Sequence, residues 1–209
     1  MDSAGVWGPA ERLSPLSKPV LREEMRRRLR ALPPGQREQE GMEAAARMEM
    51  LPLWRRFGTV LLFLSMKDEI DTLPLLNAAW KAGKQVFVPR IQGADMRFYR
   101  VKGGPWVTGP FGIPEPPEDP DGLLRQADFP ALVVTPGLAF DAGGRRLGRG
   151  KGYYDRFLAG LNRADYYAVG LCLDCQRVPC LPAGDRDKPV DALCTGRTFT
   201  AINPSDYIS

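Results

Sequence analysis

The chain of 209 residues contains no histidine, and this absence removes several kinds of chemistry. A Ser-His-Asp triad, an imidazole general base and a histidine-liganded zinc site all need a side chain that is missing here. No apolar run approaches the roughly 20 residues of a membrane-spanning helix. The first residues have neither the long apolar stretch of a signal peptide nor the arginine-rich helix of a transit peptide. We therefore expect a cytoplasmic protein with no membrane contact.

Cysteine is also scarce, and it occurs only late in the chain. The four cysteines are Cys172, Cys175, Cys180 and Cys194. The first two have the C-x-x-C spacing of a metal site, but no second such pair follows and no histidine is present to complete the ligands. We expect reduced thiols on or beside a strand rather than a metal or redox site.

Charge of one sign is only slightly in excess. The 29 lysines and arginines outnumber the 25 aspartates and glutamates and leave a net charge of +4. This balance favours anionic ligands but does not by itself indicate nucleic acid. The length suits one α/β domain with at most a small appendage. We expect residues 18–209 to form that domain and residues 1–17 to form a flexible N-terminal arm.

Apolar patterning predicts helices and strands that alternate along the chain. Helices are expected at 18–32, 36–51, 71–83 and 152–161. Strands are expected at 59–65, 85–89, 96–101, 131–135 and 166–172, which are short and rich in apolar or β-branched residues. The proline- and glycine-rich segment 103–120 is expected to be a functional loop. This order predicts an α/β fold with a mostly parallel central sheet.

The sequence DAGGRRLGRGKGYYD, from Asp141 to Asp155, lies between a predicted strand and a predicted helix. Ligands of α/β proteins bind at this edge of the sheet, and the amides that begin a helix favour anions. Three glycines would let the backbone approach a ligand closely: Gly148, Gly150 and Gly152. Three cations would bind phosphate oxygens: Arg146, Arg149 and Lys151. The segment predicts a phosphate cradle, and the alternative is a basic surface loop ahead of an ordinary helix.

Two familiar phosphate motifs do not match this segment. The P-loop requires serine or threonine after Gly150-Lys151, and Gly152 stands there instead. The dinucleotide fingerprint fails because Tyr153 occupies the position of its last glycine. The predicted cradle therefore belongs to another kind of phosphate site.

Carboxylates near this cradle are candidates for Mg²⁺, which prefers one or two carboxylates together with phosphate oxygens and water. Asp155 lies in the first turn of the predicted helix, where it would otherwise complement the helix dipole. A second carboxylate would come from the segment GDRDKPVD, through Asp185, Asp187 or Asp191.

Several blocks together resemble the 5-formyltetrahydrofolate cyclo-ligase (5,10-methenyltetrahydrofolate synthetase) family. In order they are LREEMRRRLRAL, FLSMKDEID, GKQVFVPR, GIPEP, PGLAFDAGGRRLGRGKGYYD and DKPVD. They span the chain from about Lys18 onward, and LGRGKGYYD is the most specific of them. The chain departs from the family's pattern in two places: GDRDKP lacks a histidine that commonly precedes the aspartate, and residues 1–17 have no clear match.

The resemblance implies a three-layer α/β sandwich of the NagB/RpiA/CoA-transferase kind. It also implies that 5-formyltetrahydrofolate and ATP, with Mg²⁺, give 5,10-methenyltetrahydrofolate, ADP and phosphate. A monomer that acts on small molecules, without nucleic acid or membrane partners, is expected. Arg149 and Lys151 would lie nearest the transferred group. The nucleotide would contact these cradle residues: Arg146, Gly148, Arg149, Gly150, Lys151, Gly152, Tyr153 and Tyr154. Asp155 and Asp187 match the family's magnesium positions.

The resemblance also implies a folate pocket. Glu69 matches a carboxylate that binds the pterin, Leu64 would line the pocket, and Phe111 occupies a position where the family often has tryptophan. The substrate would also contact Arg149, Gly150, Lys151, Gly152 and Tyr153. Lys18 and Arg22 lie one helical turn apart and would face the nucleotide together. Their alternative role is solvated charge, and the alternative for Glu69 is an acid that leads a helix.

Two other functions fit parts of the sequence. A relative with the same fold could be a sugar-phosphate isomerase or an acyltransferase that needs no ATP, because one fold hosts several reactions. A protein that binds RNA through its basic segments is the second alternative, but its arginines alternate with acids and no RNA-binding signature occurs.

Overall fold

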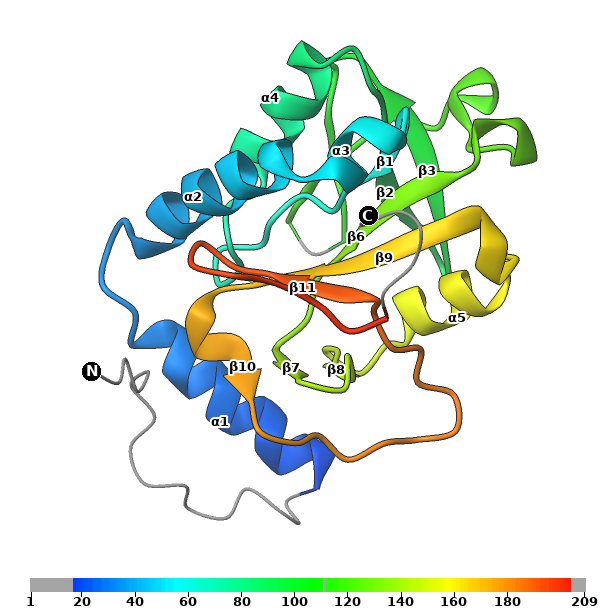
Figure 1. Cartoon of the computed structure of the whole chain (residues 1–209). Coiled ribbons are helices and arrows are strands. Elements are labelled where there is room, and N and C mark those ends of the chain that lie inside the picture. Colours follow the sequence, from blue (N-terminus) through cyan, green and yellow to red (C-terminus); the bar gives the residue numbers. More distant parts are fainter. Residues whose placement is uncertain (1–16, 111, 204–209) are drawn as a thin grey trace.

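The computed structural model describes residues 17–110 and 112–203, and a seven-stranded sheet forms its centre (Figure 1). The strands are ordered β12-β11-β9-β6-β1-β2-β3. Their bounds are Thr59–Leu61 (β1), Gln85–Gln92 (β2), Asp95–Val101 (β3), Ala131–Thr135 (β6), Tyr166–Leu171 (β9), Ala192–Cys194 (β11) and Phe199–Ala201 (β12). The pairs from β11 to β2 are parallel, and the two edge strands are antiparallel. The predicted mostly parallel sheet is confirmed.

The inner strands are buried on both faces, which explains their composition. Every residue of β6 and β9 is buried. A parallel strand covered on both sides has no solvent face, so apolar residues follow one another instead of alternating with polar ones.

One face of the sheet carries three helices. They are α2 (Gln36–Met50), α3 (Pro52–Arg56) and α4 (Leu73–Lys81). Helix α4 connects β1 to its parallel neighbour β2, and α2 packs along α4 (Figure 1). Gly83, with a φ of 71°, ends the α4 region where the sequence places a helix stop.

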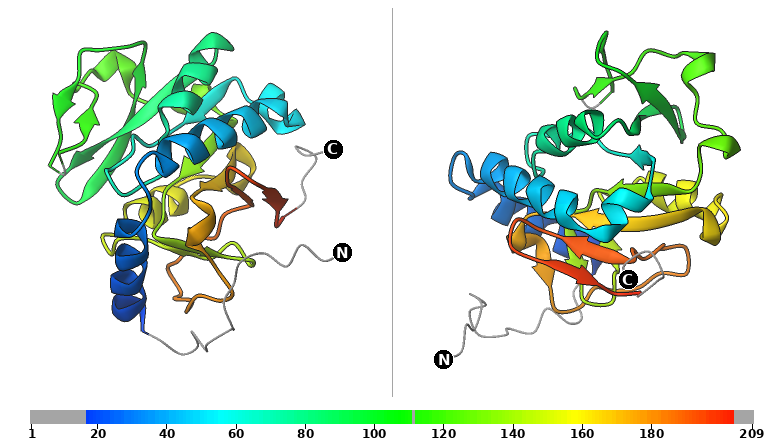
Figure 2. Two further views of the ribbon diagram at one scale, coloured as in Figure 1. Left: turned by 90° about the vertical axis from the view of Figure 1, so that its left-hand side faces the viewer. Right: turned by 45° about the horizontal axis from the view of Figure 1, so that its top comes forward.

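The opposite face is covered by α5 (Tyr153–Ala159) and a small sheet of strands ordered β10-β7-β8. These elements belong to the connections from β6 to β9 and from β9 to β11. Those connections run across the sheet in the direction opposite to the β1–α4–β2 connection, and right-handed crossovers therefore place them on the other face. The strands are Ala139–Asp141 (β7), Arg146–Leu147 (β8) and Arg177–Val178 (β10). Figure 2 shows α1 (Lys18–Arg30) beside this small sheet.

The remaining elements are short. Strands β4 (Val107–Thr108) and β5 (Pro114–Glu115) pair within the segment predicted as a loop. Single 3-10 turns complete the chain at Pro120–Gly122 (η1), Gln126–Asp128 (η2), Arg163–Asp165 (η3) and Asp174–Gln176 (η4). None of the helices in the described ranges has the length and apolar character needed to cross a membrane.

One local prediction needs correction, and one short element was not predicted. The strand expected at 59–65 ends at Leu61, although Leu62 and Phe63 are buried as their apolar character indicates. The Leu62 amide still donates to the Phe87 carbonyl of β2, and beyond it the Ser65 hydroxyl donates to the Ile70 carbonyl and accepts the Thr72 amide. The sequence also gave no indication of α3, a single helical turn.

Candidate active site

A cavity of about 350 Å³ lies at the carboxyl ends of β1, β2 and β6, beside the predicted cradle. Apolar side chains of the sheet edge, such as Phe63 and Ile91, form one wall, and the segment from Arg146 to Asp155 forms much of the other. The predicted site residues on its walls are Leu64, Glu69, Arg146, Gly148, Arg149, Lys151, Gly152, Tyr153, Tyr154 and Asp155. Phe111 lies outside the described residues. The cavity therefore combines an apolar wall with a strongly cationic one.

The predicted glycine-rich loop consists of two parts. Its first part is the tight β7–β8 hairpin, whose turn is held by Asp141: the carboxylate accepts the Gly143 and Arg145 amides. The second part, residues 148–152, is the irregular segment beside the cavity. Gly150 and Gly152 have φ values of 105° and 68°, which side-chain-bearing residues rarely adopt. The backbone there consequently depends on glycine.

Arg146 is not a loop cation but a buried residue of β8, and only 8% of it is exposed. Its Nη2 donates to Oδ1 of Asp155 over 2.8 Å, and the Lys188 amide donates to the same oxygen. Burial lowers the pKa of the guanidinium, whereas Asp155 and Asp187 raise it. Asp155 and Asp187 therefore both lie close enough to Arg146 to interact with its charge.

Helix α1 contributes two cations next to the cradle, which agrees with their predicted common face. Lys18 donates from Nζ to Oδ2 of Asp187 over 2.5 Å, and Arg22 donates from Nε to the Gly148 carbonyl over 2.9 Å. The Gly184 amide also donates to Asp187. Burial raises the pKa of Asp187, but the bonds from Lys18 and Gly184 outweigh it, and the pKa lies below its usual value.

The structure distinguishes among the three tail carboxylates. Asp191 accepts the Ala168 amide and pairs with Arg163, so it fixes the start of β9 away from the cavity. Asp185 is exposed on a turn. Asp187 alone of the three has a described contact with α1 and an electrostatic interaction with Arg146.

Arg149 connects the cradle to the opposite wall. It donates from Nε to Oε1 of Glu69 over 3.2 Å and from Nη2 to Oδ1 of Asp68 over 2.5 Å. Glu69 is 7% exposed, and its Oε2 accepts the Met66 amide. Burial raises the pKa of Glu69, and Arg149 and the Met66 amide oppose that rise only in part. The buried carboxylate therefore depends on cationic and amide donors.

The two tyrosines that begin α5 have different surroundings. The Tyr153 hydroxyl donates to the Gly93 carbonyl over 3.2 Å at the turn between β2 and β3. Tyr154 is buried against Phe98, and its hydroxyl has no hydrogen-bond partner among the described residues. Burial raises the pKa of Tyr154, and the Glu69 charge raises it further. The Tyr154 hydroxyl therefore lies near Glu69, the side chain that the resemblance implies for pterin binding.

Comparison with known proteins places this geometry in a family. The model of the 5-formyltetrahydrofolate cyclo-ligase family matches residues 15–196. The chain belongs to this family. It is 37% identical over 175 residues to the 5-formyltetrahydrofolate cyclo-ligase of Escherichia coli K12, which covers 82% of this chain and 96% of the relative. The mouse enzyme of the same name is 30% identical over 190 residues, covering 85% and 92%.

A solved structure agrees with this assignment. The 5,10-methenyltetrahydrofolate synthetase of Aquifex aeolicus superposes with a TM-score of 0.78 at 30% identity, covering 91% of this chain and 95% of that one. The resemblance inferred from the sequence and the predicted α/β fold are both confirmed. The family name, together with these relatives, indicates the predicted class of reaction, a cyclising ligase that acts on a folate.

Sequence reasoning missed two polar residues that contact the predicted cradle. Asp68 pairs with Arg149, and its position directly before Glu69 in SMKDEID was the available signal. Arg156 donates to the Lys151 carbonyl, and only its position one helical turn after Gly152 pointed to that contact. The four cysteines are free thiols, with Cys194 in β11 and Cys172 directly after β9.

Proposed function

We propose that this cyclo-ligase family member converts 5-formyltetrahydrofolate to 5,10-methenyltetrahydrofolate with ATP and Mg²⁺, releasing ADP and phosphate. The formamide carbon is a poor electrophile because its nitrogen donates into the carbonyl. Transfer of the γ-phosphoryl group to the formyl oxygen gives an N-formyl iminophosphate. N10 then attacks that carbon and loses its proton, and the former formyl oxygen leaves as part of phosphate.

The observation that supports this proposal is that the expected folate residues and the cradle residues line one and the same cavity. Glu69 and Leu64 lie on its walls together with the cradle residues Arg149 and Lys151. A pterin whose N–H groups are accepted by Glu69 would direct its formyl group toward the cradle, where a triphosphate would end. Such a reaction needs alignment and charge stabilisation rather than an enzyme nucleophile, and the second step is intramolecular. It is therefore compatible with a chain that has no histidine.

The proposed roles of the cations follow from their contacts. Lys151 is exposed at the cavity, and its ammonium has no ion pair among the described residues, so it is available to the γ-phosphoryl group. Arg149 reaches the same space but is held by two acids. Arg22 donates to the Gly148 carbonyl and so holds the backbone of the cradle. This is a second way in which Arg22 could act, besides direct contact with a phosphate.

The carboxylates present fit magnesium in the manner typical of phosphate sites. Asp155 and Asp187 each have one oxygen outside the described hydrogen bonds. No cluster of three acidic, cysteine or histidine side chains that could enclose a metal occurs in the described ranges. This pattern suits an ion that keeps waters and takes phosphate oxygens as ligands. Mg²⁺ bound there would neutralise phosphate charge and orient the triphosphate.

The proposal is tested by mixing the protein with 5-formyltetrahydrofolate and MgATP and following the methenyl chromophore. We expect product only when ATP and Mg²⁺ are both present, with one ADP formed per methenyl group. Lys151→Ala should lower kcat at least 100-fold, in the range that removal of one charge-stabilising group causes. Lys81→Ala is the matched control, because Lys81 lies at the end of α4 on the other face of the sheet.

Three results would contradict the proposal. Methenyl formation without ATP would indicate a different reaction. ATP hydrolysis without methenyl formation would show that ATP consumption is not coupled to conversion of the folate. A normal rate in Lys151→Ala, with intact folding, would remove the lysine from the mechanism.

The cytoplasmic location and monomeric state remain predictions, which subcellular fractionation and light scattering can examine.

A further inference from the structure

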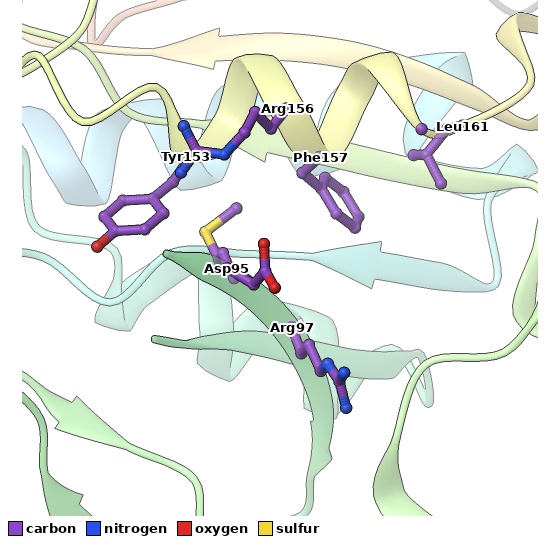
Figure 3. A pocket seen from close by; sticks show the side chains of 8 residues that line it. Asp95, Arg97, Tyr153, Arg156, Phe157 and Leu161 are labelled. Carbon is purple, nitrogen blue, oxygen red and sulfur yellow. The ribbon is translucent and has the colours of Figure 1, made fainter. Parts of the chain in front are cut away.

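Arg156 lies outside the large cavity, on the outer side of the cradle. It lines a second cavity of about 320 Å³ between α5 and β3, together with Asp95, Arg97 and Phe157. Figure 3 shows Arg156 beside Tyr153 on α5, facing the strand that carries Asp95. Tyr153 lines both cavities and so separates this arginine from the proposed reaction site.

The guanidinium of Arg156 bridges two backbone carbonyls that are far apart in the sequence. Nη1 donates to the Lys151 carbonyl over 2.8 Å, and Nη2 donates to the Ala94 carbonyl over 2.5 Å. Its central carbon lies 5.3 Å from the centre of the Tyr153 ring. The Tyr153 hydroxyl makes a parallel connection to Gly93. The cradle is thus joined at two points to the turn between β2 and β3.

The Arg156 bridge restrains the backbone of Lys151, which has few other restraints. Lys151 stands between Gly150 and Gly152, both with positive φ, so the local backbone has few intrinsic restraints. The Lys151 ammonium has no ion pair among the described residues, and only its carbonyl is fixed. The planar fork of an arginine loses little freedom when it binds two acceptors, and therefore suits this task.

We propose that Arg156 is a positioning residue that fixes the Lys151 backbone to the β2–β3 turn and thereby aims the ammonium at the transferred phosphoryl group. This rests on the proposed function. The β2–β3 turn is a suitable anchor, because Ile91 and Met96 beside it line the substrate cavity. The bridge therefore connects the phosphate side of the site to the folate side.

Helix α5 does not depend on this bridge for its packing. Leu158 is buried in the core, and the Phe157 ring packs on Phe98 at 4.6 Å between centroids. Arg156 itself is exposed. Removal of its side chain should accordingly leave the fold intact, and the functional effect can be measured without loss of protein.

The test is Arg156→Ala, with Arg97→Ala as the matched control from the same cavity. We expect Arg156→Ala to lower kcat/KM for ATP about 100-fold, the effect of a small misplacement of a catalytic group, while Arg97→Ala stays within threefold. Added guanidinium at millimolar concentration should restore much of the activity, and methylammonium should not. Arg156→Lys should be intermediate, because a lysine reaches one carbonyl at a time. Guanidinium should give Lys151→Ala no recovery.

A second readout does not depend on turnover. Amide hydrogen exchange in residues 148–152 should be faster in Arg156→Ala than in the wild type and slow again with guanidinium. Unchanged exchange, kcat/KM within threefold of wild type, or a loss that guanidinium does not reverse would each overturn the proposal. An inactive wild type would instead contradict the proposed function, and the exchange experiment would still decide the role of Arg156.

Discussion

Arg149 and Glu69 form an ion pair, from Nε to Oε1 over 3.2 Å, between two opposite walls of the cavity. The arginine belongs to the phosphate cradle, and the carboxylate is expected to bind the pterin. A folate that binds Glu69 would weaken the ion pair between Glu69 and Arg149. Phosphates that bind Arg149 would likewise release Glu69 for the folate. Because such coupling is reciprocal, each substrate should tighten binding of the other.

Asp68 should oppose nucleotide binding in the absence of folate, because it also holds Arg149. We expect Asp68→Asn to bind MgATP several-fold more tightly when folate is absent and to show a smaller gain when a non-reactive folate is added. Calorimetric titration with and without that folate measures both quantities. Asp95→Asn removes an equal charge near the cradle without touching Arg149. Equal effects in the two variants would reduce this explanation to general electrostatics.

Glu69→Gln should chiefly affect the folate. A hydrogen bond to a charged group contributes about 1.5–3 kcal/mol, so KM for 5-formyltetrahydrofolate should rise at least tenfold, and KM for ATP should change less than threefold. Initial rates at varied concentrations of each substrate separate these parameters. An unchanged folate KM would favour the alternative that Glu69 only organises the start of the segment before α4.

The same variant has a predictable effect on stability. Burial raises the pKa of Glu69 in the folded protein, so the native state holds a proton that the unfolded chain releases near the ordinary glutamate pKa of about 4.3. Stability contributed by this group falls as the pH rises from that value to the raised pKa. Glu69→Gln has no group that titrates at this position and does not lose this stability. Between the two pKa values, the free energy of unfolding in urea of Glu69→Gln relative to the wild type should therefore increase with pH.

Regular elements were predictable because their periodicity reflects burial. Leu21, Met25 and Leu29 recur at helical spacing and are all buried on α1. The apolar runs of β6 and β9 likewise became inner parallel strands. Residues of one contiguous block, such as Lys151 and Tyr153, could also be expected beside one cavity, because neighbours in a short segment stay close in space.

Contacts between distant segments were not predictable from pattern alone. Arg149 and Asp68 are 81 positions apart, and nothing in either segment specifies the pair. Arg146 resembles its cationic neighbours in sequence, yet the β7–β8 hairpin buries it, while Lys151 remains exposed. The Gly143-Gly144 pair between two short runs is a hairpin signal, but its charged surroundings favoured a single continuous loop.

The open choice among tail carboxylates gives a further prediction. Asp187→Asn should raise the Mg²⁺ concentration required for half-maximal activity about tenfold, because it removes one of two proposed ligand carboxylates and the Lys18 partner. Asp185→Asn, two positions away and exposed, should behave as the wild type. Magnesium titrations at fixed total ATP provide the comparison, and a larger shift in Asp185→Asn would transfer the proposed ligand to that residue.

Tyr154 offers a case in which function and stability should respond in opposite directions. Its hydroxyl is buried without a hydrogen-bond partner among the described residues, and Tyr154 is one of the residues that line the cavity. An unsatisfied buried polar group costs about 1–3 kcal/mol. Tyr154→Phe should therefore be at least as stable as the wild type, with a rise in Tm of about 2–4 °C for each 1 kcal/mol recovered.

The destabilising burial of the Tyr154 hydroxyl is explained if a bound substrate forms the missing hydrogen bond with it. Tyr154→Phe should then raise the KM of one substrate about fivefold to tenfold, as expected for one lost hydrogen bond of about 1 kcal/mol or slightly more. Phe157→Leu removes ring area from the same helix without altering a polar group and serves as the control. A variant that is less stable than the wild type would show that the hydroxyl already has a partner, and unchanged KM values for both substrates would exclude it from binding.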